Sequence, residues 1–416
     1  MKWIQRSLSR GLDYRAIAAR QLLYTTSPLA PGSVFFLPHG VRILNRLQEY
    51  LRSRYRRHGY DEVSSPQLYK RALWEQSGHA QCYAQDMFYV AGEEEQLALK
   101  PMNCPGHCLM YAASEHSYRD LPLRYADFSP LHRNEASGAL SGLTRLRRFH
   151  QDDGHIFCTR DQVESEISAA LALLDEVYTA LRVPSYRLLL STRPANFMGR
   201  VEEWERAEEQ LRRSLDASSI PWTVNEADGA FYGPKIDVIL TDGEGRQHQT
   251  ATIQLDFQLP LRFHLTYRTS NGGEDVPVMI HRALLGSLER FLAILMETTG
   301  GKWPFWLSPR QAVIATVNDA PETLAFATHV QRIVSGISDE SIGQRTFFVD
   351  LDGSARTVGK KAAAARDLGY NYVITIGDRE VKDSLLHVQQ RGGQQADRVA
   401  ALDLYHTFVA HEQRLS

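Results

Sequence analysis

The chain has 416 residues, of which 43% are hydrophobic and 10% aromatic, and its formal net charge is −2. This length predicts two or three domains with sizeable cores, and this composition excludes an intrinsically disordered or collagen-like protein. The near-neutral charge also excludes a uniformly basic surface, so any contact with nucleic acid must come from local basic patches.

The first 27 residues differ in composition from the rest of the chain. Five basic residues stand among apolar residues and serines, and Asp13 is the only acid before Glu49. Such an arginine-rich, acid-poor amphipathic segment is typical of a presequence for the mitochondrial matrix, although an ordinary basic first helix is the alternative. We expect cleavage between Tyr24 and Ser27. Four irregularly spaced cysteines agree with a reducing compartment, and no apolar run is long enough to span a bilayer.

The next part of the chain alternates helical and strand-like runs. Residues 41–58 carry apolar and basic residues at helical spacing, and a short strand-like run at 61–66 follows. Thr159 and Gln162 have the spacing of a capping box and predict the start of a helix. Between residues 187 and 260, short β-rich runs surround a charged helix at 201–214. This pattern favours an α+β fold in which helices pack against an antiparallel sheet.

The last third of the chain has a different order of expected elements. After a linker rich in glycine and proline, the expected strands and helices alternate regularly. This alternation predicts a smaller, mostly parallel α/β domain at 305–416, separate from a larger domain at 28–304. The expected strands are 312–317, 346–350 and 372–376, and the expected helices are 321–334 and 358–368.

The most informative stretch is Arg133–His155, which predicts two strands joined by a basic, glycine-rich loop. Period-two alternation places Arg133 and Glu135 on one face of the first strand. It places Gln151, Asp153 and His155 on one face of the second strand. Together these groups can hold a phosphate, an adenine edge, an ammonium group and a metal ion in one pocket. The alternative interpretation is a solvated, charged hairpin.

This hairpin resembles motif 2 of the class II aminoacyl-tRNA synthetases, and the resemblance extends from about Pro31 to the C-terminus. It implies a class II antiparallel sheet flanked by helices, followed by a C-terminal anticodon-binding domain. It also implies a homodimer, with the helix and strand that end at Pro66 as motif 1. Four further runs are similar to threonyl-tRNA synthetases specifically: Lys100–His107, Ala230–Lys235, Thr252–Pro260 and Met279–Ala283.

The activity that this resemblance implies is that of a threonine–tRNA ligase in mitochondrial translation. Such an enzyme makes threonyl-adenylate from ATP and L-threonine, releases pyrophosphate and transfers threonine to the 3′ end of tRNA(Thr). The chain leaves no room for the N-terminal editing domain of many family members, so we expect measurable mischarging with serine. Two rival interpretations are a synthetase-like RNA-binding protein without catalysis and a zinc hydrolase with Asp153 as its general base.

The resemblance further implies a zinc ion held by Cys104, His155 and His281. Three protein ligands leave coordination positions open for substrate, as in catalytic zinc sites. In the family the zinc binds the amino acid directly, and Asp153 matches the residue that accepts a hydrogen bond from the threonine hydroxyl. A rival local ligand set combines Cys104 with its neighbours His107 and Cys108, which we otherwise interpret as packing residues.

The remaining implied roles concern ATP, with bridging Mg²⁺, and the transfer step. Arginine suits the phosphate contacts because its planar fork stays charged and binds oxygens in pairs. A histidine that titrates near neutrality could help deprotonate the ribose hydroxyl, although a satisfied core or surface histidine is the alternative for His79. The expected catalytic residues are His79, Arg133, Lys235 and Arg290. The expected ATP-binding residues are Arg133, Glu135, Arg145, Gln249, Thr252, Gln254 and Arg290. The expected substrate-binding residues are Met102, Gln151, Asp153, Tyr232, Gln249 and Ser287.

Overall fold

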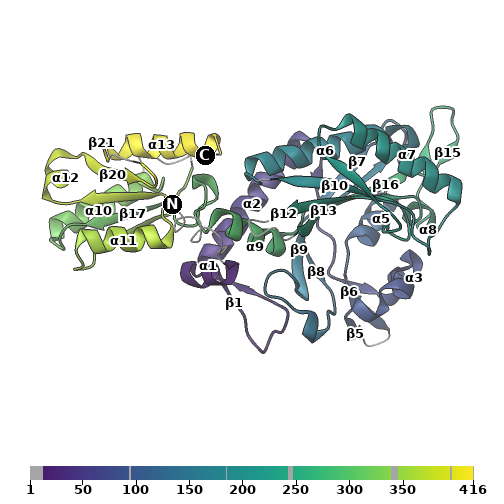
Figure 1. Cartoon of the computed structure of the whole chain (residues 1–416), viewed down its shortest axis with the longest axis horizontal. Coiled ribbons are helices and arrows are strands. Elements are labelled where there is room, and N and C mark those ends of the chain that lie inside the picture. Colours follow the sequence, from purple (N-terminus) through teal and green to yellow (C-terminus); the bar gives the residue numbers. More distant parts are fainter. Residues whose placement is uncertain are drawn as a thin grey trace, which may run out of the picture. The chain divides into compact units, whose positions relative to one another are not determined.

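The computed structural model describes residues 13–92, 95–183, 185–241, 247–338, 345–393 and 396–415, which fold into two units (Figure 1). Among the described residues, unit 1 contains 26–34 and 49–298, and unit 2 contains 13–25, 35–48 and 299–415. Helix α2 (Pro38–Arg57) begins in unit 2 and ends in unit 1. Within these ranges, no helix combines the length and the apolar character that crossing a membrane requires.

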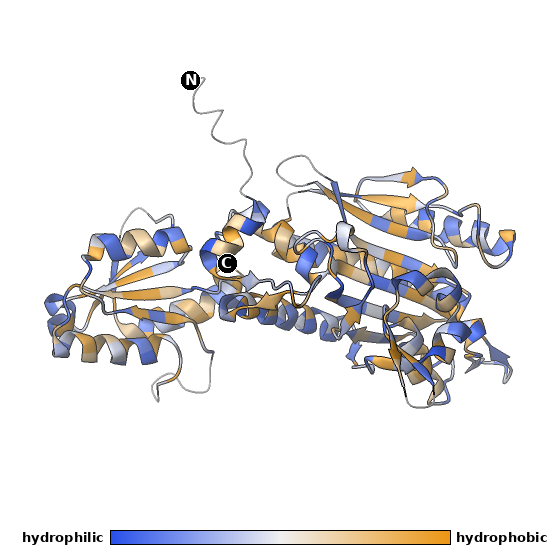
Figure 2. Ribbon diagram, turned by 90° about the horizontal axis from the view of Figure 1, so that it is seen from below, coloured by the Kyte–Doolittle hydropathy of each residue, from blue (hydrophilic) through white to orange (hydrophobic). Residues whose placement is uncertain are grey.

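Unit 1 is built on a mainly antiparallel sheet, as the β-rich runs predicted. In the described part of the chain this sheet has nine strands, in the order β11-β10-β12-β13-β16-β9-β7-β3 with β8 beside β9. Figure 2 shows how apolar and polar residues alternate along its strands. The strands are β3 (Asp61–Glu62), β7 (Leu123–Asp127), β8 (Pro130–His132), β9 (Arg148–Cys158), β10 (Tyr186–Ser191), β11 (Trp222–Asn225), β12 (Lys235–Thr241), β13 (Gln247–Asp256) and β16 (Val278–Ser287).

Helices α6 (Val163–Ala180) and α7 (Val201–Ala217) pack against each other and against this sheet. The capping box of Thr159 and Gln162 precedes α6, as predicted. The other helices of unit 1 are α3 (Arg71–Ser77), α4 (His79–Cys82), α5 (Cys104–Ala112), α8 (Leu259–Arg262) and α9 (Leu288–Thr299), with 3-10 turns η1 (Ala84–Asp86), η2 (Ser137–Ala139) and η3 (Arg160–Gln162). Two small sheets contain β4 (Leu68–Lys70), β5 (Tyr89–Ala91) and β6 (Gln96–Leu99), and β14 (Tyr267–Arg268) and β15 (Glu274–Asp275).

A buried charged group fixes the end of β16. The guanidinium of Arg282 lies over the rings of Tyr55 and Tyr60, 4.1 and 4.3 Å from their centroids. The carboxylate of Asp152 accepts hydrogen bonds from the backbone N–H groups of Leu284 and Leu285 at 2.8 and 2.9 Å. These two bonds hold the irregular stretch between Ala283 and Ser287, where β16 leaves its register with β9 and passes into α9.

Unit 2 is the predicted α/β domain. Its sheet has the order β18-β17-β19-β20-β21, with β18, β17 and β19 parallel and the last two strands antiparallel. Three elements have the predicted bounds, and β18 begins three residues later than expected. The elements are β17 (Ala312–Thr316), α10 (Pro321–Val334), β18 (Val349–Asp352), α11 (Val358–Leu368), β19 (Tyr372–Ile376), α12 (Asp378–Asp383), β20 (Leu386–Gln390), β21 (Asp397–Val399), α13 (Ala401–Gln413) and the 3-10 turn η4 (Phe305–Leu307).

The second half of the expected presequence is part of unit 2. Residues 14–25 form α1 (Tyr14–Gln21) and β1 (Tyr24–Thr25), and β1 pairs with β2 (Phe35–Phe36). Gln21 is buried: its amide donates to the carbonyl of Gly301 at 2.7 Å and accepts from the indole of Trp303 at 2.8 Å. Cleavage near Ser27 would remove these contacts. The arginine-rich residues 1–12 lie outside the described ranges, and the two units divide at 298–299 rather than at 304–305.

Candidate active site

The candidate residues stand in rows across the central strands of unit 1. Residues directly opposite on neighbouring strands share a face, and so do residues two apart on one strand. The first row contains Lys235, Gln254, His281 and His155, on β12, β13, β16 and β9. The second row, two residues along each strand, contains Asp237, Thr252, Ala283 and Asp153. The sheet register therefore brings predicted residues from four separate stretches of sequence onto one face.

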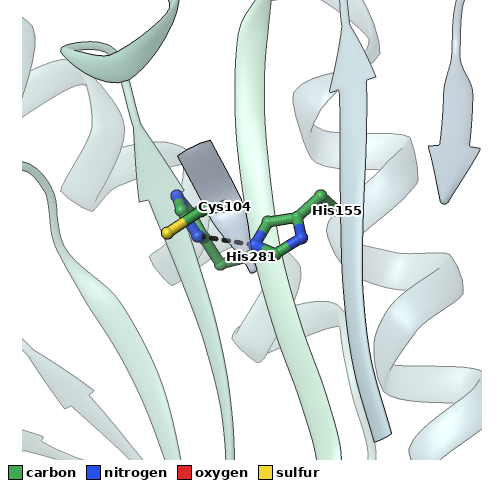
Figure 3. Close-up of side chains that lie close together, drawn as sticks. All are labelled: Cys104, His155 and His281. Carbon is green, nitrogen blue, oxygen red and sulfur yellow. Dashed lines mark hydrogen bonds between the residues drawn. The ribbon is translucent and has the colours of Figure 1, made fainter. Parts of the chain in front are cut away.

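Cys104, His155 and His281 converge on one point (Figure 3). One ligand atom from each lies within 4.8 Å of the other two, and the residues are only 4%, 1% and 8% exposed. Nε2 of His155 lies 3.0 Å from Nδ1 of His281, whose Nε2 lies 2.9 Å from the carboxylate of Asp256. Burial raises the pKa of the Cys104 thiol and lowers the pKa of the His155 imidazole. A bound cation would reverse the effect on Cys104 by stabilising the thiolate, and it would bind His155 in the neutral form that burial already favours.

The rival set of Cys104, His107 and Cys108 does not form a ligand group. Cys108 packs in the core, with its sulfur 3.8 Å from that of Met279, as expected for a packing residue. His107 is fully buried, as expected for a packing residue, but it also makes polar contacts that the sequence did not indicate. Its Nδ1 lies 2.8 Å from Nδ1 of His155, on the side of that ring away from His281. Among the described residues, the only group with metal-binding geometry is Cys104, His155 and His281.

A cavity of about 220 Å³ lies on the same face, beside the outer end of β9. Arg133, Arg145 and Arg290 line it, and Glu135 is its acidic residue. Arg145 Nε donates to Glu135 at 2.8 Å, so three guanidinium groups are offset by one carboxylate. Burial and the charges of the other two arginines lower the pKa of Arg290. The remaining lining residues are Thr144, Leu146, Phe149, Gln151, Gln249, Thr250, Ala251, Thr252, Ala283, Gly286 and Ser287.

The hairpin is not as regular as the sequence predicted. The first strand, β8, ends at His132, so Arg133 and Glu135 lie in the loop rather than on one face of a strand. Arg133 N still donates to the carbonyl of Arg147 at 2.8 Å, but Asn134 N donates to the carbonyl of Asp86 instead. This contact turns the chain away from β9, because a backbone N–H used elsewhere cannot continue the ladder. The second strand was predicted correctly, with Gln151, Asp153 and His155 on one face of β9.

His79 and Met102 lie beside the cysteine and the two histidines. Nε2 of His79 is 3.2 Å from the sulfur of Met102 and 3.9 Å from that of Cys104, and Nδ1 is 2.8 Å from the Ser77 hydroxyl. His79 is buried, which excludes the surface alternative, and burial lowers its pKa to about 4. The expectation that His79 titrates near neutrality is therefore wrong: its imidazole is neutral at pH 7, and burial makes it a weaker base than an ordinary histidine.

Tyr232 completes this wall of the site. Its ring lies 5.4 Å from that of His281, and its hydroxyl donates to the side chain of Gln254. Gln254 in turn donates to the hydroxyl of Thr252 at 3.0 Å. Asp153 accepts a hydrogen bond from the amide of Asn103 at 3.0 Å. Asn103 directly precedes Cys104, so one turn of chain places both a metal-ligand candidate and a partner of Asp153.

Asp237 is a site residue that the sequence analysis missed. Its carboxylate lies 2.9 Å from Nζ of Lys235 and 2.5 Å from the amide nitrogen of Gln249. The ion pairs with Asp237 and Asp228 outweigh burial and raise the pKa of Lys235. The sequence signal was available: Asp237 is two residues from Lys235 and so shares its face of the strand.

Comparisons with known proteins identify the family of this chain. Residues 88–299 match the tRNA synthetase class II core domain (G, H, P, S and T), and residues 311–411 match an anticodon binding domain. A probable mitochondrial threonine–tRNA ligase of Schizosaccharomyces pombe is 53% identical over 91% of this chain and 84% of its own length. The chain belongs to the threonine–tRNA ligase family.

Other members of this family differ in how much of their length the chain covers. The mitochondrial threonine–tRNA ligase of Saccharomyces cerevisiae is 44% identical, over 95% of this chain and 90% of its own length. Human cytoplasmic threonine–tRNA ligase 2 is 49% identical, but the chain spans only 47% of that protein. A crystal structure described as the RNA binding domain of threonyl-tRNA synthetase from Cryptosporidium parvum Iowa II has a TM-score of 0.91 at 43% identity, over 96% of this chain and 98% of its own. These matches confirm the class II fold that the hairpin predicted.

Proposed function

We propose that this chain activates L-threonine with ATP and transfers it to the 3′ end of tRNA(Thr). The observation that supports this most strongly is the joint placement of two groups along β9. Gln151 lines the arginine cavity, and His155 belongs to the cysteine–histidine group four residues further on. At strand spacing these positions are about 13 Å apart, a suitable span for one aminoacyl-adenylate. Asp153 lies between them.

The arginine cavity would bind ATP with its Mg²⁺. Three guanidinium groups against one carboxylate leave an excess of two positive charges, which phosphate oxygens can neutralise. Arg133 would contact the α-phosphate, where negative charge increases as the threonine carboxylate attacks, and Arg290 would contact the γ-phosphate. Glu135 would accept a hydrogen bond from the adenine amino group. The neighbouring Arg145, Gln249, Thr252, Gln254 and Ser287 would complete the adenylate pocket.

Cys104, His155 and His281 would hold a zinc ion. Their donor set of one sulfur and two imidazole nitrogens suits zinc, and their burial and close approach support it. When bound, zinc would supply open coordination positions for the amino group and hydroxyl of threonine, which valine cannot fill. Asp153 would accept the hydrogen bond from that hydroxyl, while Met102, Gln151 and Tyr232 would form the walls. Serine has the same two donors and lacks only a methyl, worth about 1 to 3 kcal/mol.

The transfer step would use His79 and the C-terminal unit. His79 is neutral and buried beside the metal-ligand candidates, so it could accept a proton from the ribose hydroxyl. Lys235, held by Asp237, would provide a fixed positive charge at the other end of the same row. Unit 2 matches an anticodon binding domain and would bind the tRNA anticodon.

We assign the protein to mitochondria because two relatives that it covers over 84% and 90% of their own length are mitochondrial enzymes, and we place it in the matrix, where translation requires it. We further propose a homodimer formed through α2 and β3, which resemble motif 1. Strand β3 lies at the edge of the large sheet, where pairing groups remain available.

The direct test is threonine-dependent exchange of pyrophosphate into ATP. Wild-type protein should support exchange with threonine, less with serine and essentially none with valine. His281→Ala should abolish it, whereas His116→Ala, a change on the C-terminal side of α5, should not. Binding of tRNA without any exchange would favour the non-catalytic alternative and contradict the proposal. Equal exchange with valine would contradict the zinc-based selection.

A further inference from the structure

His107 is a buried histidine that the proposed reaction does not use. It lies in α5, three residues after Cys104, and its side chain is fully buried. Its Nδ1 is 2.8 Å from Nδ1 of His155, and its Nε2 is 3.4 Å from the carboxylate of Asp127. The two imidazole planes are nearly perpendicular, at 86°, so this contact is a hydrogen bond between ring edges rather than a stack.

The carboxylate of Asp127 is surrounded by hydrogen-bond donors that favour its ionised form, so it can only accept a hydrogen bond from His107. One carboxylate oxygen accepts from the backbone and hydroxyl of Ser65 at 3.1 and 2.7 Å. The other accepts from the backbone of Ser129 at 2.7 Å and from its hydroxyl. The ammonium of Lys100 lies 3.8 Å away and is also fully buried. Because an ionised carboxylate has no proton to give, Nε2 of His107 must carry one.

The proton position on His107 determines the proton position on His155. A neutral imidazole with its proton on Nε2 has a lone pair on Nδ1, so His107 accepts and Nδ1 of His155 donates. Nε2 of His155 is then left with a lone pair, and it points toward His281. On the other side, Asp256 fixes the proton of His281 on Nε2, which leaves its Nδ1 with a lone pair as well. Two lone pairs thus face each other at 3.0 Å, next to the sulfur of Cys104.

We propose that His107 and Asp127 form a relay that fixes His155 in the tautomer able to bind a metal. His107 is a positioning residue, not a ligand: its Nδ1 is occupied by His155 and its Nε2 by Asp127. The inference rests on the proposed zinc site. It implies that the two histidine ligands of that site are oriented in different ways. One histidine is oriented directly by a carboxylate, and the other is oriented through a second imidazole. Such outer partners fix ring orientation and raise the basicity of the ligand nitrogen.

The test is the rate at which zinc-loaded, full-length protein loses zinc to an excess of chelator, followed with a chromophoric indicator. His107→Phe keeps a buried aromatic ring but removes the acceptor, and we expect zinc loss to be about 10- to 100-fold faster. His107→Asn places an amide oxygen near the former Nδ1 and should recover part of this loss. The matched control, His116→Phe in the segment just after α5, should leave the rate within about twofold of wild type, because His116 contacts Tyr111 and the backbone of Arg268, neither of which is a candidate ligand.

Two results would overturn the relay. The first is zinc loss from His107→Phe at the wild-type rate, and the second is equal acceleration in the Phe and Asn variants, which would indicate an effect of packing alone. If His107→Phe does not fold, Asp127→Asn tests the same relay, since an amide can donate to His107 and reverse its tautomer. The KM for threonine should rise in these variants while the KM for ATP stays unchanged. Wild-type protein that binds no zinc would instead refute the proposed metal site itself.

Discussion

Gly286 stands at the turn from β16 into α9, and replacing it with alanine should damage ATP binding more than folding. Its φ of +63° lies in the left-handed region, which costs alanine about 1 to 2 kcal/mol. An added Cβ would also lie 2.4 Å from the carbonyl oxygen of Thr250 on β13. Restoring an ordinary contact of 3.4 Å requires a shift of about 1 Å, since 3.4 − 2.4 = 1.0. A displacement of this size at a catalytic site costs about 100-fold in rate.

The assay is pyrophosphate exchange at varied ATP. We expect the KM for ATP to rise and kcat/KM to fall by about 100-fold in Gly286→Ala, because Ser287 and Arg290 follow directly after the displaced turn. Threonine KM should change much less. Gly138→Ala is the matched control: it lies in the hairpin over the same cavity, and nothing lies within 4 Å of its added Cβ. A folded Gly286→Ala enzyme with wild-type ATP kinetics would refute the reasoning.

Three further predictions concern stability, processing and transfer. Burial and two guanidinium groups lower the pKa of His39 to about 4 from 6.5, so the unfolded chain binds the extra proton, and stability present above pH 6.5 is lost as the pH falls toward 4. This loss should be about 1 to 2 kcal/mol after solvent screening, and it should be absent in denaturant titrations of His39→Gln. A protein that starts at Pro28 should melt several degrees lower than one that starts at Asp13; equal melting temperatures would mean that α1 is dispensable. His79→Ala should slow transfer to tRNA at least about tenfold while sparing pyrophosphate exchange, and equal losses in both half-reactions would contradict its assignment.

Much of the fold could be predicted because local pattern and tertiary structure agree. Helices α10 and α11 and strand β19 have the bounds that their apolar spacing predicted. Strands β20 and β21 were not predicted, because short antiparallel strands with polar exposed faces carry a weak apolar signal. The segment 14–25 was assigned to a presequence because its composition fits one; only its burial against the Gly301–Trp303 turn shows that it packs in unit 2.

The residues of the candidate site also fall into a predicted group and a group that was missed. The residues that the family resemblance implied, such as Cys104 and His281, do come together on one face. The partners that orient them were missed. Asp256 and Asp127 lie on strands whose neighbours are set by sheet register, and register depends on contacts between distant segments. The hydrogen bonds of His107 were missed because a buried histidine next to a proposed ligand has the same sequence signal whether it only packs or also forms hydrogen bonds.

The central claim is that Cys104, His155 and His281 hold a zinc ion that selects the amino acid. X-ray absorption at the zinc edge of active, purified protein tests it most directly, because it counts the atoms bound to the metal. We predict one sulfur, two imidazole nitrogens and lighter solvent ligands, with the last replaced on addition of threonine but not of valine. A protein that charges tRNA without bound zinc, or a zinc spectrum that does not change when threonine is added, would contradict the account.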